Sequence, residues 1–135
     1  MKFLVDNNLA PALARALSEL CKTREPRVEG VFALKDRFPA DTPDNVWLSA
    51  LAAEGGWNIV SADNFRKGSA EKEIMRRAGF NVFVLQKYWA SQQYWPKASQ
   101  LVLWWPKIIE YASQSQHVAA RVPWKVSGKF EHINF

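Results

Sequence analysis

Four short apolar runs, each separated from the next by a segment with helical periodicity, constrain the fold of this chain most strongly. The runs are β-prone and too short to be helices, so we interpret them as buried strands. They lie at Lys2–Val5, Arg27–Ala33, Trp57–Ser61 and Phe80–Leu85. Alternation of strands and helices predicts a parallel sheet with right-handed crossovers and helices on both faces. We therefore predict an α/β fold, a three-layer α/β/α sandwich around a central parallel sheet of about four strands.

The segments between the runs carry apolar residues at the spacing of an amphipathic helix. Predicted helices cover residues 9–21, a segment from Asp44 to Gly55, a segment from Ser69 to Ala78, and residues 96–113. Asn7 or Asn8 is expected to cap the first helix. Pro106 falls inside the last one and predicts a kink or a break there.

The length of 135 residues corresponds to about one domain. We assign residues 1–113 to the α/β domain and residues 114–135 to a polar, basic tail. No apolar run approaches the roughly 20 residues of a membrane helix, and an acid at position 6 comes too soon for a signal peptide. The single cysteine, Cys21, fits a reducing cytoplasm.

The charge balance favours an anionic partner. The chain has 18 basic and 13 acidic residues, a net charge of +5, and a sequence pI of about 9.5. A basic surface is typical of proteins that bind nucleic acid. The apolar fraction of 48% is that of a globular protein, which excludes wholesale disorder.

Acidic residues follow the predicted strands at one edge of the sheet. Asp6 ends the first strand, and Asp63 lies just past the third. Asp44 begins the helix after the second strand, and Glu71 lies in the first turn of the next helix. Ligand sites of open α/β sheets lie beyond the carboxyl ends of the strands, so these acids are expected to converge there. Clustered carboxylates without Cys or His favour Mg²⁺ or Mn²⁺.

Several polar residues accompany these acids in the same loops. Basic side chains that could hold phosphates are Lys35, Arg37, Arg66 and Lys67. Asn7 and Asn64 are typical turn residues, and their amide oxygens can also place a water at a metal site. Asp44 is equally consistent with a helix N-cap, and Glu71 is typical of a first-turn acid that the helix dipole favours.

Three sequence blocks resemble the PIN-domain family, in particular its short PIN-like branch of bacterial toxin ribonucleases. The blocks are FLVDNNLAPALARAL, TPDNVWLSALAAEGGWNIVSADNF and EKEIMRRAGFNVFVL, within residues 1–88. The resemblance implies a small α/β/α sandwich that cleaves RNA with divalent metals, and it places the metal-binding acids at Asp6, Asp44 and Asp63. A fourth acid of the family pattern has only Glu71 or Asn64 as its counterpart. An antitoxin protein is the partner that a toxin of this kind would have.

We therefore predict a ribonuclease that hydrolyses RNA phosphodiesters with Mg²⁺ or Mn²⁺ at Asp6, Asp44 and Asp63. Two other functions remain open at this point. A receiver-type phosphoacceptor domain also has acids after its first and third strands, and Lys87 would imitate its lysine. A non-catalytic PIN-like binding module would bind RNA or protein without cleaving.

The chain has seven tryptophans, five of which lie between Trp89 and Trp124. Trp104 and Trp105 share a helical face with apolar neighbours, which predicts core packing. Trp89, Trp95 and Trp124 lie in loops or beside prolines and are expected to be less buried. Such aromatics either stack on bases or form an interface with a partner or a second copy of the chain, and we favour the interface.

Overall fold

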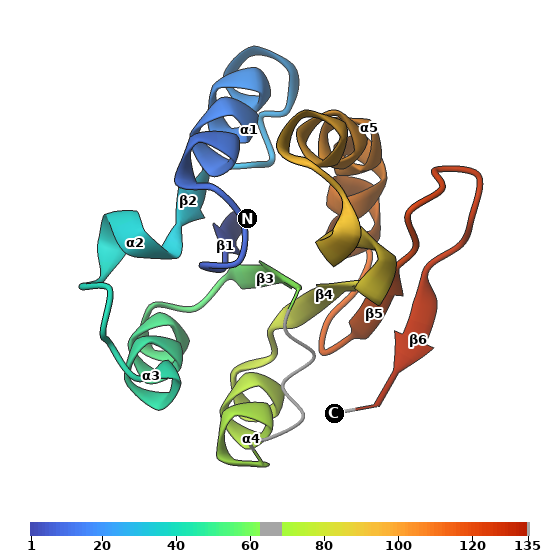
Figure 1. The fold of residues 1–135 in the computed structure, drawn as a ribbon. Coiled ribbons are helices and arrows are strands. Elements are labelled where there is room, and N and C mark those ends of the chain that lie inside the picture. Colours follow the sequence, from blue (N-terminus) through green and yellow to red (C-terminus); the bar gives the residue numbers. More distant parts are fainter. Residues whose placement is uncertain (63–68, 135) are drawn as a thin grey trace.

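The computed structural model describes residues 1–62 and 69–134, which form three layers (Figure 1). The strands are β1 (Lys2–Val5), β2 (Gly30–Ala33), β3 (Trp57–Ser61), β4 (Asn81–Leu85), β5 (Ala119–Val122) and β6 (Glu131–Ile133). The helices are α1 (Pro11–Arg24), α2 (Leu34–Arg37), α3 (Asp44–Glu54), α4 (Ser69–Ala78) and α5 (Tyr94–Ser113), with a 3-10 helix, η1, at Lys87–Ser91. No helix in the described part of the chain is both long and apolar enough to cross a membrane.

The strands form one sheet with the order β2-β1-β3-β4-β5-β6 among the described residues. The first five strands run parallel, and β6 pairs antiparallel with β5. The central strand β1 has a fixed register on both sides, since Val5 lies opposite Ala33 of β2 and Val60 of β3. The predicted three-layer α/β/α sandwich is confirmed, although the sheet has six strands in the described ranges rather than about four.

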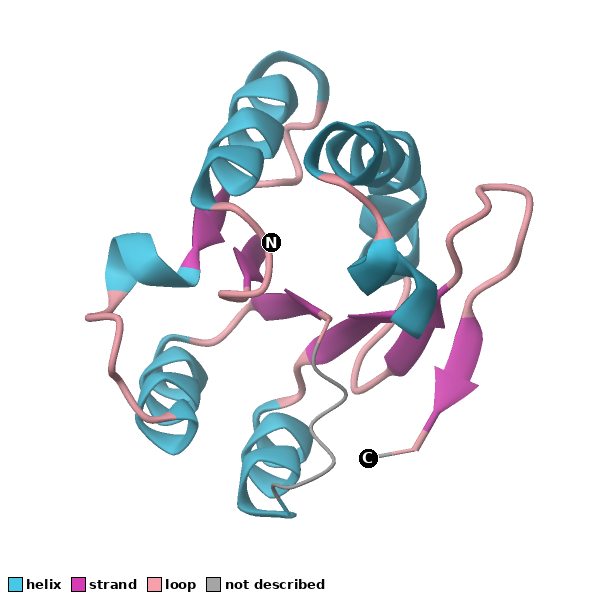
Figure 2. Ribbon diagram, viewed as in Figure 1, coloured by secondary structure: helices cyan, strands magenta, loops and turns pink. Residues whose placement is uncertain are grey.

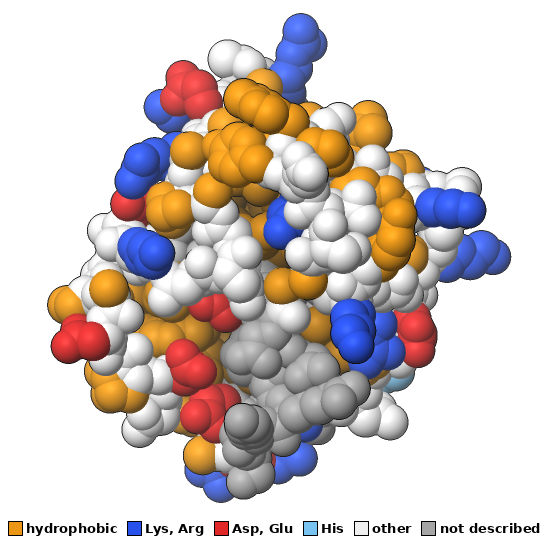
Figure 3. Space-filling model, in the orientation of Figure 1, with side chains coloured by type: hydrophobic (Ala, Val, Ile, Leu, Met, Phe, Trp, Pro, Cys, Tyr) orange, Lys and Arg blue, Asp and Glu red, His pale blue; other side chains and the backbone are white. Residues whose placement is uncertain are grey.

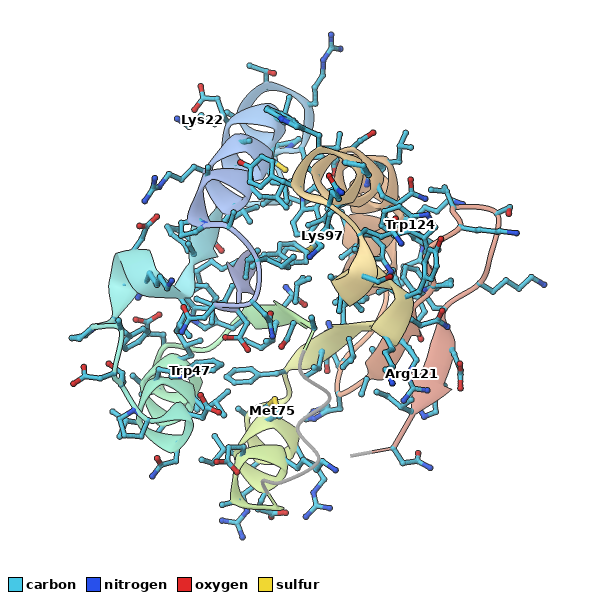
Figure 4. The ribbon with its side chains drawn as sticks, viewed as in Figure 1. Lys22, Trp47, Met75, Lys97, Arg121 and Trp124 are labelled. Atoms are coloured by element: carbon cyan, nitrogen blue, oxygen red, sulfur yellow. The ribbon has the colours of Figure 1, made fainter. Side chains whose placement is uncertain are left out.

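Successive residues of each strand point to opposite faces of the sheet, which divides the core into two layers. Phe3 and Val5 of β1 pack in the layer beneath α1 and α5, whereas Leu4 packs in the layer of α3 and α4. Figures 1 and 2 show these helix pairs on opposite sides of the strands. Figure 4 shows Trp47 of α3 and Met75 of α4 in the second layer, where both side chains are fully buried.

The segment expected to be a polar tail contributes to the sheet. Ala119–Val122 form β5 beside β4, and Glu131–Ile133 form β6 at the edge. These strands are four and three residues long and lack the apolar runs of the central strands. Their structure depends on pairing with β4, a tertiary contact that local periodicity does not reveal.

The helix ends differ from the prediction at two places. No side chain caps α1, because its N-cap residue is Ala10, so the expected cap by Asn7 or Asn8 is wrong. Instead, Asn8 accepts a hydrogen bond at Oδ1 from the Ala62 N–H (3.2 Å), across the sheet. The last helix, α5, continues through Pro106 without the predicted break, because the apolar side chains around the proline stay buried in the core.

The tryptophans divide between core and surface. Trp104 and Trp105 are buried, as predicted, and Trp95 is 77% exposed. The expectation for Trp89 is wrong: its side chain is fully buried, and its Nε1 donates a hydrogen bond to the Val122 carbonyl oxygen (3.0 Å). Trp124 is partly buried against Trp89, with ring centroids 4.8 Å apart. The segment after α5 thus provides the partners that bury Trp89.

A hydrogen-bond network joins β3, β4 and the chain after α5 at the amino ends of the strands. The buried Asn81 donates from Nδ2 to Asn58 Oδ1 (2.9 Å) and to the Ser115 carbonyl oxygen (3.1 Å). Its Oδ1 accepts a hydrogen bond from the Val118 N–H (3.3 Å). Removing the Asn81 side chain would leave its hydrogen-bond partners in three segments without it, and buried polar groups without partners are unfavourable.

We therefore predict that Asn81→Ala lowers the free energy of unfolding by about 1–3 kcal/mol. Urea denaturation followed by circular dichroism measures this change. Asn45→Ala, at an exposed position on α3, is the matched control and should change the stability little. Equal stabilities of the two variants would contradict the structural role of Asn81.

Candidate functional site

The reversal of strand order in the sheet lies between β1 and β3. The chain passes from β1 to β2 on one side and then returns to β3 on the other, so the two flanking connections leave in opposite directions. In open α/β sheets this switch point opens a crevice outside the carboxyl ends of the strands. Asp6 follows β1 directly at this place.

The Asp6 carboxylate is held by its surroundings. Its Oδ1 accepts a hydrogen bond from the Asn7 N–H (2.6 Å), and its Oδ2 accepts one from the Ser61 hydroxyl (2.9 Å). The Asp6 N–H donates to the Val60 carbonyl oxygen (3.0 Å), which continues the pairing of β1 with β3. These contacts fix the orientation of the Asp6 carboxylate at the end of β1.

Ser61 is a functional candidate that the sequence analysis missed. It ends β3, is fully buried, and its hydroxyl points at the acid of the neighbouring strand. Its only sequence signal is a hydroxyl residue that ends an apolar strand. This signal indicates a functional role only once β3 is known to pair with β1.

Asp44 occupies the first position of α3, at the same edge of the sheet. The N-cap residue is Pro43, so the expected N-cap role of Asp44 is wrong. The Asp44 Oδ1 instead accepts a hydrogen bond from the Trp47 Nε1 (3.0 Å), whose indole is fully buried. The other oxygen, Oδ2, receives no hydrogen bond from the residues that the structure describes.

Glu71 lies in the first turn of α4 and is half-buried. Since α4 runs from the carboxyl edge to the amino edge of the sheet, the topology places Glu71 at the same edge as Asp6 and Asp44. Within residues 1–62 and 69–134, no group of three or more His, Cys, Asp or Glu side chains is close enough to hold a metal ion. The described acids therefore do not complete a metal centre by themselves.

Four of the predicted site residues, Asp63, Asn64, Arg66 and Lys67, lie outside the described residues. Position 63 follows Ser61 by two residues, and Ser61 contacts Asp6.

Arg37, one of the basic residues expected beside the acids, instead contacts Glu54 and Trp57. Arg37 donates from Nη2 to Glu54 Oε1 (2.6 Å) and lies over the Trp57 ring, 4.9 Å from its centroid. Glu54 ends α3 and Trp57 begins β3, so Arg37 turns toward the amino edge, away from Asp6. Lys35 is exposed on α2, directly after the edge strand β2.

Asp36 forms an ion pair with Arg15. Arg15 of α1 donates to both of its carboxylate oxygens, at 2.9 Å and 2.6 Å. The hydrogen bonds from Arg15 lower the pKa of the Asp36 carboxyl below its ordinary value. This pair joins α1 to α2 and leaves Asp36 outside the group of candidate ligands.

The charges of this face are separated in space. Figure 3 shows acidic side chains gathered over the region of α3 and α4, whereas basic side chains lie around them, over α1 and α2, below α4 and toward β4 and β5. Figure 4 also shows Lys97 projecting from α5 toward the middle of the same view. The sequence analysis did not single out Lys97, because nothing local distinguishes it among the 18 basic residues.

The oxygen donors at this edge of the sheet are of the chemical kind that a hard divalent cation prefers. Asp6 and Asp44 provide carboxylate oxygens, and the oxygens of Asp6 are fixed in orientation by Asn7 and Ser61. Oxygen-only ligands select Mg²⁺ or Mn²⁺. Hydrogen bonds of the kind that Ser61 donates orient metal ligands in many proteins.

The fold and this site define an α/β protein with acidic side chains at the carboxyl edge of its sheet. The family model of the PIN-like domain matches residues 1–87, well over half of the 135 residues. The chain therefore belongs to the PIN-like domain family, whose members are generally nucleases. No curated protein and no solved structure gives a significant match to the chain.

Family membership argues against the receiver-type alternative.

We predict that Asp44→Ala destabilises the fold more than Asp44→Asn does. Both substitutions remove the charge at the start of α3, but the asparagine oxygen still accepts the Trp47 hydrogen bond. The difference in unfolding free energy should be about 1–3 kcal/mol, the cost of a buried donor without an acceptor. Urea denaturation of both variants measures it, and equal stabilities would show that the Trp47 contact contributes nothing.

Proposed function

We propose that the chain is a divalent-metal-dependent endoribonuclease. Asp6, Asp44 and Asp63 would hold Mg²⁺ or Mn²⁺ in the crevice at the switch point, with Glu71 as the fourth acidic ligand. A divalent cation supplies Lewis acidity and activates a water for attack on phosphorus. The class of reaction is hydrolysis of an RNA phosphodiester.

The observation that carries this proposal is the placement of Asp6. Its carboxylate lies at the strand-order reversal, and Ser61 of the neighbouring strand fixes its orientation. Asp63 follows Ser61 by two residues, so in this proposal it would supply a second acid beside Asp6. The match to the PIN-like family agrees with nuclease chemistry at these acids.

Other residues have supporting roles in this proposal. Asn7 holds Asp6 through its backbone N–H, and its side chain together with that of Asn64 would contact the substrate. Lys35, Arg66 and Lys67 would bind phosphates on either side of the cut. The single cysteine, Cys21, agrees with action in a reducing cytoplasm.

Asp6→Asn and Asp63→Asn are expected to lower the rate of RNA cleavage by more than about 100-fold with Mg²⁺ or Mn²⁺. Asp6→Asn keeps the acceptor for the Asn7 N–H and an amide that can donate to the Ser61 hydroxyl, so the fold should persist. A labelled RNA incubated with increasing metal concentrations provides the measurement.

Asp41→Asn, at an exposed position in the loop before α3, is the matched control and should cleave at the parental rate. If Asp63→Asn cleaves at the parental rate with Mn²⁺ present, the metal assignment is wrong. RNA binding without cleavage under any divalent ion would instead support a non-catalytic PIN-like module.

The finer part of the proposal is a toxin role with an antitoxin protein as partner. It is supported by the resemblance of the first block, FLVDNNLAPALARAL, to the short toxin branch of the family. Induced expression in a bacterium should arrest growth, and Asp6→Asn should restore it because the arrest would depend on RNA cleavage. Arrest by Asp6→Asn to the same degree as the parent would contradict a ribonuclease toxin.

A further inference from the structure

A hollow lies at the carboxyl ends of β4 and β5, on the same edge of the sheet as Asp6. Its volume is about 720 Å³, and it is lined by Ala62, which follows β3, and by residues of β4, η1 and β5, among them Leu85, Lys87, Tyr88 and Arg121. Ala62 follows Ser61, whose hydroxyl holds Asp6. The hollow therefore begins one residue away from the contact that orients the candidate metal ligand.

A second hollow of about 720 Å³ lies on the other side of Tyr88. It shares Gln86 and Tyr88 with the first, and Gln100, Trp124 and Lys125 also line it. The two hollows thus form a path that leads from Ala62 past Tyr88 toward the segment after β5. Figure 4 shows Arg121 and Trp124 on this side of the molecule, beyond β4.

Tyr88 stands between the hollows as an exposed ring on a fixed backbone. Its side chain is 57% exposed, and its ring meets the Trp124 ring edge-on, with centroids 5.7 Å apart. The next residue, Trp89, is fully buried and bonded to Val122 through its indole. A large aromatic group that is held rigidly and left exposed is suited to stacking on a planar ligand.

The charges of the two hollows favour an anion. Lys87 and Arg121 line the first hollow, and Lys125 lines the second, whereas no described residue lining either one is acidic. Arg121 donates from Nη1 to Glu131 Oε1 (3.1 Å), and this contact uses one nitrogen of its guanidinium group. Cations around an exposed aromatic ring are the combination that binds single-stranded nucleic acids.

We propose that these hollows form a binding track for single-stranded RNA, in which a base stacks on Tyr88 and phosphates contact Lys87 and Arg121. The proposal rests on the proposed nuclease function for the identity of the ligand. An unpaired base is required, because bases in a duplex are already stacked on their neighbours. The track holds the nucleotides beyond the cut and positions the scissile phosphate near Asp6.

Binding of a fluorescein-labelled oligouridine, measured by anisotropy in EDTA, separates this track from the metal chemistry. Tyr88→Ala should weaken binding by about tenfold or more, the effect expected for loss of one stacked base. Tyr88→Phe keeps the ring face and should bind like the parent. Tyr94→Ala is the matched control, because Tyr94 is 51% exposed on α5 and lines neither hollow.

The basic residues give a second measurement. Lys87→Gln and Arg121→Gln should each weaken binding and reduce the slope of log K against log salt by about 0.7, the value for one phosphate contact on a single strand. Arg77→Gln, on the exposed side of α4, should change neither quantity. Equal affinities of Tyr88→Ala, Tyr94→Ala and the parent would overturn the proposal, as would equal binding of a duplex of the same length.

Failure of the track and failure of the nuclease assignment are distinguishable. Asp6→Asn should bind the oligouridine in EDTA at least as tightly as the parent does, because the track does not contain the acid and the substitution removes a charge that repels phosphate. Metal-dependent cleavage combined with unchanged binding by Tyr88→Ala would overturn the track alone. Intact Tyr88-dependent binding with no cleavage in any divalent ion would support the track and contradict the nuclease assignment.

Discussion

The register of β1 against β3 is the constraint on which the rest of the structure depends. The two strands are short, with four and five residues, and the pairing of Val5 with Val60 sets which side chains meet beyond their ends. A slip by one residue would turn every side chain of β1 to the opposite face. Phe3 and Leu4 would then exchange layers, and Asp6 would lose the Ser61 hydroxyl. The same register thus fixes both the core and the candidate site.

The two edges of the sheet differ in how far their polar groups are satisfied by hydrogen bonds. At the amino ends of the strands, Asn58 and Asn81 satisfy one another and the chain after α5. At the carboxyl ends, polar groups such as Asp44 Oδ2 have acceptor capacity left among the described residues. Parallel strands impose this division, because every helix that follows a strand begins at the same edge.

The net charge of +5 describes the surface poorly. Asp36, Glu54, Glu73 and Glu131 each form an ion pair with an arginine, so their charges are compensated locally. Asp44 differs from these acids, since its Oδ1 accepts a hydrogen bond from the Trp47 indole. The positions of the acidic residues in the fold therefore say more about function than the net charge does.

Much of the central fold could be predicted from the sequence, because the strands of the parallel core are continuous apolar runs. The bounds of β3 and α4 agree with the prediction, whereas β5 and β6 were missed because their residues become strands only by pairing with β4. Asn8 and Asp44 were given local capping roles, but their side chains bond to Ala62 and Trp47. Trp89 was expected at the surface, since the residues that cover it come from a distant segment. The edge that carries the acids could be predicted from topology, but the contacts that orient each acid could not.

The arrangement of acids and cations along this edge gives a physical reason for a directional substrate path. A polyanion approaching Asp6 and Asp44 alone would be repelled, and a cation bound there would reverse the sign of the local potential. The basic side chains of Lys87, Arg121 and Lys125 lie beside β4 and β5, where no acid lines the hollows in the described part of the chain. An RNA strand would therefore be attracted first to the hollows and would enter the crevice only where a metal has compensated the carboxylates. Binding and cutting would then occupy adjacent parts of one sheet edge, joined by the peptide from Ser61 to Ala62.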